Sequence, residues 1–286
     1  MSPVIYMLEK EFLEHKLVTR LPLFLAIFAV VNFMLVMSGG DNLNISYQIS
    51  GMDEWAGFSN VTGYAGIIGK LNIIVAGIVA TITFFSYVPK TLRKERQEGS
   101  LMFWRSMPVS DNLAIAVKLI FALVVIPLVA SVLLLFSDVI VWVLASWFMP
   151  ADMLATSSIS FASLIMHWFD FLGRMVLVSL ALLPVACLLM VLSQITNHPL
   201  VTLFIAVVMI KLMTYMVFGS SVVGDWISQI YNLPFKILTS DSPVTVFFSL
   251  GTVTLIALLA ASIGLFWMCA KLRSSDDFAR KLGMNS

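Results

Sequence analysis

Residues 113–148 read LAIAVKLIFALVVIPLVASVLLLFSDVIVWVLASWF, and almost every one of them is apolar. A helix of about 20 such residues crosses the hydrocarbon core of a bilayer, which is about 30 Å thick. At ~1.5 Å per residue this stretch is too long for one crossing, so we expect either a kink at Pro127 or first turns outside the membrane. The membrane part is expected near 119–146.

Further apolar runs of membrane-spanning length lie on both sides of this stretch. The whole chain is 60% hydrophobic and only 12% charged, whereas soluble domains carry about 25% charged residues. The sequence therefore predicts an all-α polytopic membrane protein with a single transmembrane domain over residues 1–286, and an even number of spans puts both termini on one side. The six spans are expected near 21–38, 67–89, 119–146, 169–193, 199–218 and 244–270.

Residues 1–20 differ from these runs because charged side chains interrupt them. Apolar residues recur at helical spacing on one face of this segment, and charged residues occupy another face. We therefore expect an amphipathic helix that lies on the membrane surface. The apolar face consists of Val4, Ile5, Leu8 and Phe12, and the charged face includes Lys10, Glu11 and Glu14.

The basic residues indicate the orientation of the chain. Of its 17 lysines and arginines, 13 lie in the N-terminal segment, around the loop after the second span and in the C-terminal tail. Basic residues gather on the cytoplasmic side of membrane proteins. Both termini are thus expected in the cytoplasm, with the loops 39–66, 149–168 and 219–243 on the opposite side.

A search for catalytic motifs predicts neither an active site nor a metal site. The segment GYAGIIGKLN at 63–72 lacks the glycine spacing of a phosphate-binding loop and the hydroxyl residue that would follow its lysine. The three histidines lie far apart in the sequence, and Cys187 and Cys269 fall in apolar runs, so neither a metal cluster nor a disulfide is expected. The cytoplasmic segments total only about 65 residues, too few for a nucleotide-binding domain of the usual size. Energy for any active process must then come from another chain.

Polar residues within the spans are candidates for a transport pathway. Lys211 lies in the fifth span, where a charge costs roughly 2.5–3.5 kcal/mol on insertion scales. Its side chain either extends to the outer interface beside Tyr215 or faces the bundle interior or a cavity. In the second case it could contact an anionic substrate or pair with Asp138, for which Arg174 is an alternative partner. The candidate pathway residues are Asn72, Thr81, Thr83, Asp138, Lys211 and Tyr215.

The loop 219–243 contains more than a linker. Five of its apolar and aromatic residues recur at spacings of three and four, which predicts a short helix that either anchors in the outer leaflet or covers a cavity. These residues are Trp226, Ile227, Ile230, Tyr231 and Leu233.

Residues 90–112, KTLRKERQEGSLMFWRSMPVSDN, hold the densest charge in the chain. Charges of both signs precede a Gly-Ser break, an apolar group follows at 101–104, and Ser110 or Asp111 can cap the next helix. Aromatic anchors dominate interface energies, so this pattern favours a docking element. The alternative is a basic loop held by anionic lipid.

The stretch RKERQEGSLMFWRSMPVSDNLAIAVKL, residues 93–119, together with the six-span topology, resembles the permease subunits of type-2 (exporter) ABC transporters. In that family a Glu-Arg-x-x-Gly-Ser/Thr-Leu run precedes a Leu/Met-Pro-Val-Ser step and a helix start containing lysine. The matching positions here are Glu95, Arg96, Gly99, Ser100, Leu101, Met107, Pro108, Val109, Ser110 and Lys118.

The resemblance implies a cytoplasmic coupling segment over 90–112 that contacts a separate ATPase subunit. It implies two ATPase copies, a second permease copy, expected as a homodimer, short re-entrant helices before the last span, and location in a bacterial inner membrane. ATP and Mg²⁺ would then bind the partner ATPase rather than this chain, which is not expected to be an enzyme, and lipid rather than nucleic acid would surround it. The residues expected to contact the ATPase are Arg93, Glu95, Arg96, Glu98, Gly99, Leu101, Phe103, Trp104 and Pro108.

Two other classes of function stay open. An ATP-independent transporter or channel would build its cavity inside one chain, usually from repeats, and the two halves of this sequence show no internal similarity. A membrane-embedded enzyme or assembly factor is the other alternative, and a membrane enzyme would need a catalytic cluster at one depth, which the sequence does not indicate.

Overall fold

The computed structural model describes residues 3–38, 67–97, 110–148, 159–219 and 221–274, and all regular secondary structure in these ranges is helical. The chain is an all-α polytopic membrane protein, as predicted. Among the described residues, five helical stretches are long and apolar enough to cross a membrane. These stretches are Gly69–Lys94, Asp111–Trp147, Phe161–Ile195, Pro199–Val217 and Thr252–Arg273.

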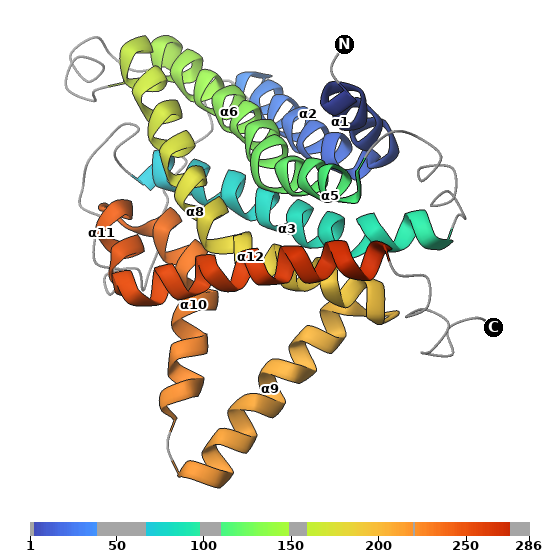
Figure 1. Ribbon diagram of the computed structural model, residues 1–286. Coiled ribbons are helices and arrows are strands. Elements are labelled where there is room, and N and C mark those ends of the chain that lie inside the picture. The colour runs from blue at the N-terminus through green and yellow to red at the C-terminus, as the bar shows by residue number, and fades with distance from the viewer. Residues whose placement is uncertain (1–2, 39–66, 98–109, 149–158, 220, 275–286) are drawn as a thin grey trace.

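The helices follow the chain in the order shown in Figure 1. The expected N-terminal helix and first span correspond to α1 (Pro3–Glu14) and α2 (Lys16–Ser38). The boundary between them lies at His15, earlier than the predicted position near residue 20. The remaining helices are α3 (Ile67–Gln97), α5 (Asp111–Ile120), η1 (Phe121–Val125), α6 (Ile126–Phe148), α8 (Phe161–Ile195), α9 (Pro199–Phe218), α10 (Val222–Thr239), α11 (Pro243–Phe248) and α12 (Thr252–Ser274).

Local sequence signals account for the helix ends that were predicted well. The helix α9 has the predicted bounds because Pro199 occupies its first turn and Gly219 ends it in the left-handed conformation, with φ of 62°. The amide of Gly219 donates to the carbonyl of Tyr215 at 2.9 Å. The helix predicted within 219–243 is confirmed as α10.

The helices that correspond to the second, fourth and sixth predicted spans differ from them in extent. The second span was expected to end at Pro89, but α3 continues through this proline to Gln97, because a membrane helix tolerates the missing N–H where its neighbours compensate. The span expected at 169–193 begins at Phe161. The span expected at 244–270 is divided into α11 and α12 at Gly251, whose φ of 84° suits glycine and breaks a helix.

The apolar run 113–148 is not one regular α-helix, and its helical geometry changes just before Pro127. A single π-helical turn, η1, separates α5 from α6 just before this proline. Pro127 has no N–H to donate to the carbonyl of Leu123, four residues earlier. The hydroxyl of Ser179 on α8 donates to this carbonyl instead, at 2.6 Å. A neighbouring helix thus supplies the hydrogen bond that the proline cannot.

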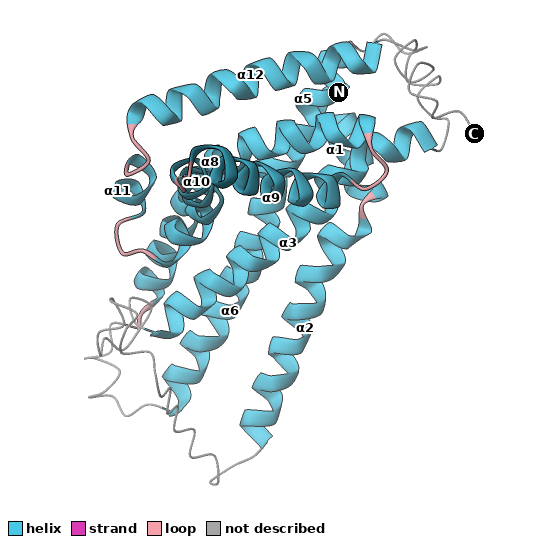
Figure 2. Cartoon of the chain, turned by 90° about the horizontal axis from the view of Figure 1, so that it is seen from below, coloured by secondary structure: helices cyan, strands magenta, loops and turns pink. Residues whose placement is uncertain are grey.

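The helix α8 lies at the centre of the bundle, where it packs against α3, α6, α10 and α12 (Figure 1). The helices α2, α3 and α6 run alongside one another in both views (Figures 1 and 2). The buried core includes Phe121, Phe171, Leu189 and Met190, all fully buried. In contrast, α9 and α10 extend from the bundle as a V, and most described side chains of α9 are exposed.

Several helix ends meet at one end of this bundle. Arg273 at the end of α12 pairs with Asp111 at the start of α5, with 3.0 Å between Nε and Oδ1. The turn between α8 and α9 lies there too, because Arg93 near the end of α3 donates to the carbonyl of Asn197. With α1 at the same place (Figures 1 and 2), the described N-terminal and C-terminal helices share one end, which agrees with an even number of crossings. The distribution of basic residues predicts that this end faces the cytoplasm.

Candidate functional site

A buried ion pair joins α1 to α5 at this end of the bundle. The Nζ atom of Lys118 lies 2.5 Å from Oε1 of Glu11. The two residues are 107 positions apart in the sequence, and both are buried, with 2% and 3% of their surfaces exposed. Charges are seldom removed from water this completely unless each has a partner and further hydrogen bonds.

Two side chains of α3 complete the hydrogen bonding of this pair. Lys118 also donates to Oγ1 of Thr91 at 2.9 Å. The hydroxyl of Tyr87 donates to Oε2 of Glu11 at 2.8 Å, and that of Thr91 donates to the same oxygen at 3.4 Å. We call Glu11, Tyr87, Thr91 and Lys118 the junction network; it ties three helices together through one carboxylate and one ammonium group.

The electrostatics of the junction network keep Glu11 ionised. Burial raises the pKa of its carboxyl, but the charge and hydrogen bond of Lys118 and the hydrogen bond from Tyr87 together leave this pKa below its usual value. His15 lies beside the network, with its ring 4.6 Å from that of Tyr87 and Nε2 3.5 Å from Glu11. Burial lowers the pKa of His15 to about 4, and the neighbouring Glu11 offsets this only in part. The imidazole is therefore neutral at pH 7.

These pKa values predict a loss of stability in acid. The unfolded chain protonates His15 near its usual pKa of 6.5, whereas the folded chain does so only near 4, so the unfolded state binds more protons between these values. Stability should fall as the pH drops through this window, and the lowered pKa of Glu11 acts in the same direction at its lower end. Thermal unfolding of purified protein at pH 7, 6, 5 and 4 measures this dependence. The variant His15→Gln should show a weaker dependence between pH 6.5 and 5, and an unchanged one would contradict the assignment.

The junction network stands at both ends of the predicted coupling segment. Thr91 lies in the last two turns of α3, and Lys118 lies in the last turn of α5. Ser110 was one of two candidate caps and is confirmed as the cap of α5, since its Oγ accepts from the amide of Leu113 at 3.3 Å. Lys94 on α3 also approaches Glu14 on α1, with 3.9 Å between Nζ and Oε2.

The structure describes only part of the predicted coupling segment. Arg93 is described and bridges to the turn after α8 through the carbonyl of Asn197. Glu95 and Arg96 lie in the last turn of α3. The other predicted contact residues fall outside the described residues: Glu98, Gly99, Leu101, Phe103, Trp104 and Pro108.

Within one chain, the predicted pathway residues lie in several different settings. Asn72 and Asp138 are brought together, with Nδ2 of Asn72 donating to Oδ1 of Asp138 at 2.8 Å. Thr81 and Thr83 instead donate to carbonyls of their own helix, at 2.8 Å and 2.7 Å. Tyr215 lies on α9 with 66% of its surface exposed.

The ion pairs suggested for the spans were wrong. Lys211 does not pair with Asp138; its Nζ donates to Oγ of Ser228 on α10, at 2.7 Å. Arg174 does not pair with Asp138 either. Its Nε donates to Asp170 at 2.7 Å, and its Nη1 donates to the carbonyls of Ile237, Leu238 and Ser240 at 2.9 Å, 3.4 Å and 2.5 Å.

Asp138 has a partner that the sequence did not indicate. A hydrogen bond of 2.6 Å joins its Oδ2 to Nδ1 of His167 on α8, and Asp138 is fully buried. Asp138, His167 and Asn72 thus connect α6, α8 and α3 away from the junction network. Near the start of α3, Nζ of Lys70 lies 2.8 Å from Oδ1 of Asp241, which precedes α11. This ion pair also lies away from the junction network.

Sequence reasoning missed most of the junction network. Glu11 was placed only on the charged face of a surface helix, and Tyr87, Thr91 and His15 were not assigned a role together. One signal was present: Lys118 stands in an apolar helix, where a lysine needs a buried acidic partner. In comparisons with protein-family models, curated proteins and solved structures, no match to this chain was found.

Proposed function

We propose that this chain is the permease subunit of an ATP-driven exporter of the type-2 ABC class, which forms its translocation pathway as a dimer and is driven by a separate ATPase. The junction network carries the proposal. It joins the two helices on either side of residues 98–109 to each other and to α1, and these residues belong to the stretch that resembles the coupling motif of that class.

The chemistry of the junction network suits the transmission of force. A buried ion pair with further hydrogen bonds has a defined geometry and resists separation, since parting the charges leaves each of them unpaired in a medium of low polarity. A displacement of the coupling segment would therefore move α5 together with the last turns of α3. Both helices continue across the membrane, α5 through η1 into α6, so such a movement reaches the opposite side.

The shape of the fifth span supports a dimer. The helices α9 and α10 extend from the bundle as a V (Figure 1). Lys211 on α9 donates to Ser228 on α10 and so joins the two helices. A charged group is costly in lipid, and a second copy packed on the V would shield it. In this arrangement ATP and Mg²⁺ bind the ATPase, and the chain itself supplies no catalytic residue.

One observation favours a second candidate, an ATP-independent transporter. Ionisable residues buried between membrane helices often mark ion or proton pathways, and Asp138 with His167 forms such a pair. A transporter of this kind would work without any ATPase, which makes the two candidates separable.

Purification from native membranes in a mild detergent tests the proposal. The tagged chain should retain a partner that hydrolyses ATP, and the variants Glu98→Lys and Pro108→Ala should reduce that activity per copy of the chain, since both lie in the coupling segment. The variant Asp241→Asn is the control. It removes a charge before α11 whose side chain is 68% exposed and which lies away from both the coupling segment and the V, and it should leave the ATP hydrolysis unchanged.

Two results would contradict the proposal. One is a stable, ATPase-free chain that by itself moves solute into sealed vesicles, which would favour the second candidate. The other is a co-purified ATPase whose activity is insensitive to changes across residues 98–108.

A further inference from the structure

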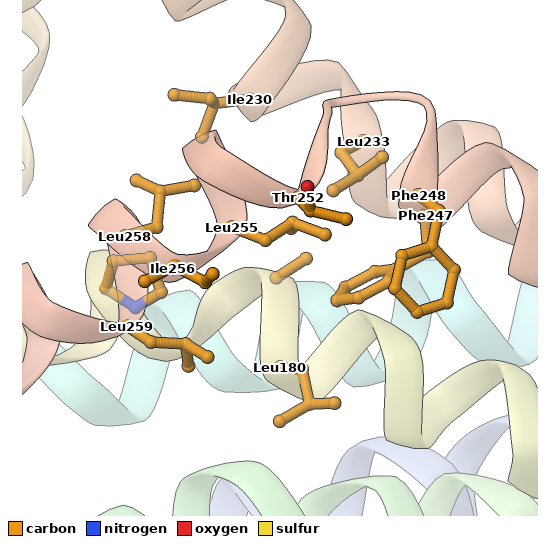
Figure 3. A pocket seen from close by; sticks show the side chains of 12 residues that line it. Leu180, Ile230, Leu233, Phe247, Phe248, Thr252, Leu255, Ile256, Leu258 and Leu259 are labelled. Carbon is orange, nitrogen blue, oxygen red and sulfur yellow. The ribbon is translucent and has the colours of Figure 1, made fainter.

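A cavity lies between α8, α10, α11 and α12, away from the junction network. Its volume is about 290 Å³. Figure 3 shows side chains from these helices converging on it, with Phe247 and Phe248 along one side and Leu180 on the wall formed by α8. The described lining residues are Leu180, Ala181, Pro184, Ile230, Leu233, Phe247, Phe248, Thr252, Leu255, Ile256, Leu258 and Leu259.

The chemistry of this lining selects an apolar ligand. Thr252 provides the only side-chain polar atom among the described lining residues, and none of them is charged. A polar or ionised ligand would lose its hydration here and gain almost no hydrogen bonds in return. The volume lies near the low end of small-molecule sites, about 300–1,000 Å³, so the cavity suits one slender hydrocarbon segment rather than a bulky molecule.

The route into the cavity leads from the bilayer. Ile256 and Leu259 stand on α12 with much of their surface exposed, and Phe248 on α11 is exposed as well. The helix α12 is long and apolar enough to cross a membrane, so these rim residues face hydrocarbon. The occupant therefore comes from the lipid phase.

We propose that this cavity binds a single acyl chain of a membrane lipid, inserted between α12 and α10 and resting on α8. Its concave shape distinguishes it from the other exposed apolar surfaces. Residues from four helices, α8, α10, α11 and α12, line it. A bound chain would fill the space behind the corner at Gly251, where α11 turns into α12.

Photolabelling of the full chain in phosphatidylcholine vesicles tests this proposal. The vesicles contain a small fraction of phosphatidylcholine with a diazirine near the end of one acyl chain, and peptide mass spectrometry locates the label after irradiation. Label on Leu255, Leu258 and Ile230 should exceed that on Leu128 and Val132, which are exposed on the membrane-spanning helix α6, several-fold.

Substitutions on α8 provide a matched comparison. The variant Ala181→Phe fills the cavity and should reduce the label on α12 several-fold. The variant Val176→Phe adds similar bulk on the same helix, at a side chain that is 61% exposed, and should not change it. If Ala181→Phe does not fold, Leu255→Trp narrows the cavity from α12 and serves in its place, with helical circular dichroism as the check of folding.

Three results would overturn the proposal. They are equal labelling of the cavity and of Leu128 and Val132 on α6, undiminished labelling in a folded cavity-filling variant, and preferential labelling of the cavity by a lipid whose diazirine is carried on its headgroup.

Discussion

Replacing Lys118 with methionine should destabilise the protein by roughly 3–5 kcal/mol, the usual cost of removing one member of a buried ion pair. The methionine fits the space of the lysine stem, so the loss comes mainly from the charge. Glu11 would stay buried with Tyr87 and Thr91 as hydrogen-bond donors but without its cation. Unfolding by heat in detergent, followed by circular dichroism, measures the change.

The double variant Glu11→Leu with Lys118→Met should recover most of this stability, because no unpaired charge is left inside. Lys10→Met is the matched control on the same helix as Glu11. Its partner Glu14 lies one helical turn away at 3.3 Å, and both side chains are partly exposed, so the change should cost less than about 1 kcal/mol. If Lys118→Met costs no more than Lys10→Met, the junction network is not a stabilising ion pair.

The junction network also links stability to the proposed function. Because Thr91 and Lys118 lie on the two helices that flank the coupling segment, the double variant should fold yet transmit force poorly. If the proposed ATPase co-purifies with the double variant, substitutions in the coupling segment should change the rate of ATP hydrolysis less than they do with the unaltered chain.

The helices of this protein could be predicted where their limits are set locally. The bounds of α9 followed from an apolar run between Pro199 and Gly219, and the helix α10 followed from the spacing of its aromatic and aliphatic residues. In both cases the residues that define the helix lie within the helix or next to it.

The start of α8 was placed too late because residues 149–168 were assigned to an outward loop. The first turns of this helix carry His167 and Asp170, and the partner of His167 is distant in the sequence. In the structure His167 bonds to Asp138 on α6, and Asp170 bonds to Arg174. The cap was also unusual, since Ser160 and Ser163 bond reciprocally in place of the more frequent serine and glutamate.

The sequence predicted the part of the candidate site on α3 and α5 but not the part on α1. The pattern of 90–112 and the lysine at 118 pointed to this end of the chain, but Glu11 lies more than a hundred residues away on a helix expected to rest on the membrane surface. Periodicity assigns residues to faces of a helix and does not identify which distant face they meet. The partners of Lys211 and Arg174 escaped prediction for the same reason, because Ser228 and the carbonyls at the end of α10 have no signature in sequence.

The second large effect concerns Asp138 and His167. Interhelical hydrogen bonds in membrane proteins contribute only about 0.6 kcal/mol on average, whereas one member of a buried ionisable pair costs roughly 3–5 kcal/mol when it is left alone. Asp138 is fully buried and is held by His167 at 2.6 Å and Asn72 at 2.8 Å. We therefore expect Asp138→Leu and His167→Leu each to lower the free energy of unfolding by roughly 3–5 kcal/mol. The amount of folded protein in the membrane should fall with it.

The double variant Asp138→Leu with His167→Leu should be more stable than His167→Leu alone, since it removes the buried carboxyl that the single change isolates. Asp170→Asn on α8 is the control. Asp170 is partly exposed, and Arg174 keeps its carbonyl partners without it, so this change should cost no more than about 1 kcal/mol. Thermal unfolding of the four variants in one detergent gives the coupling energy. A double variant that loses the sum of the two single losses would show that the residues act independently, and single losses near the average hydrogen bond would reduce the pair to an ordinary interhelical contact.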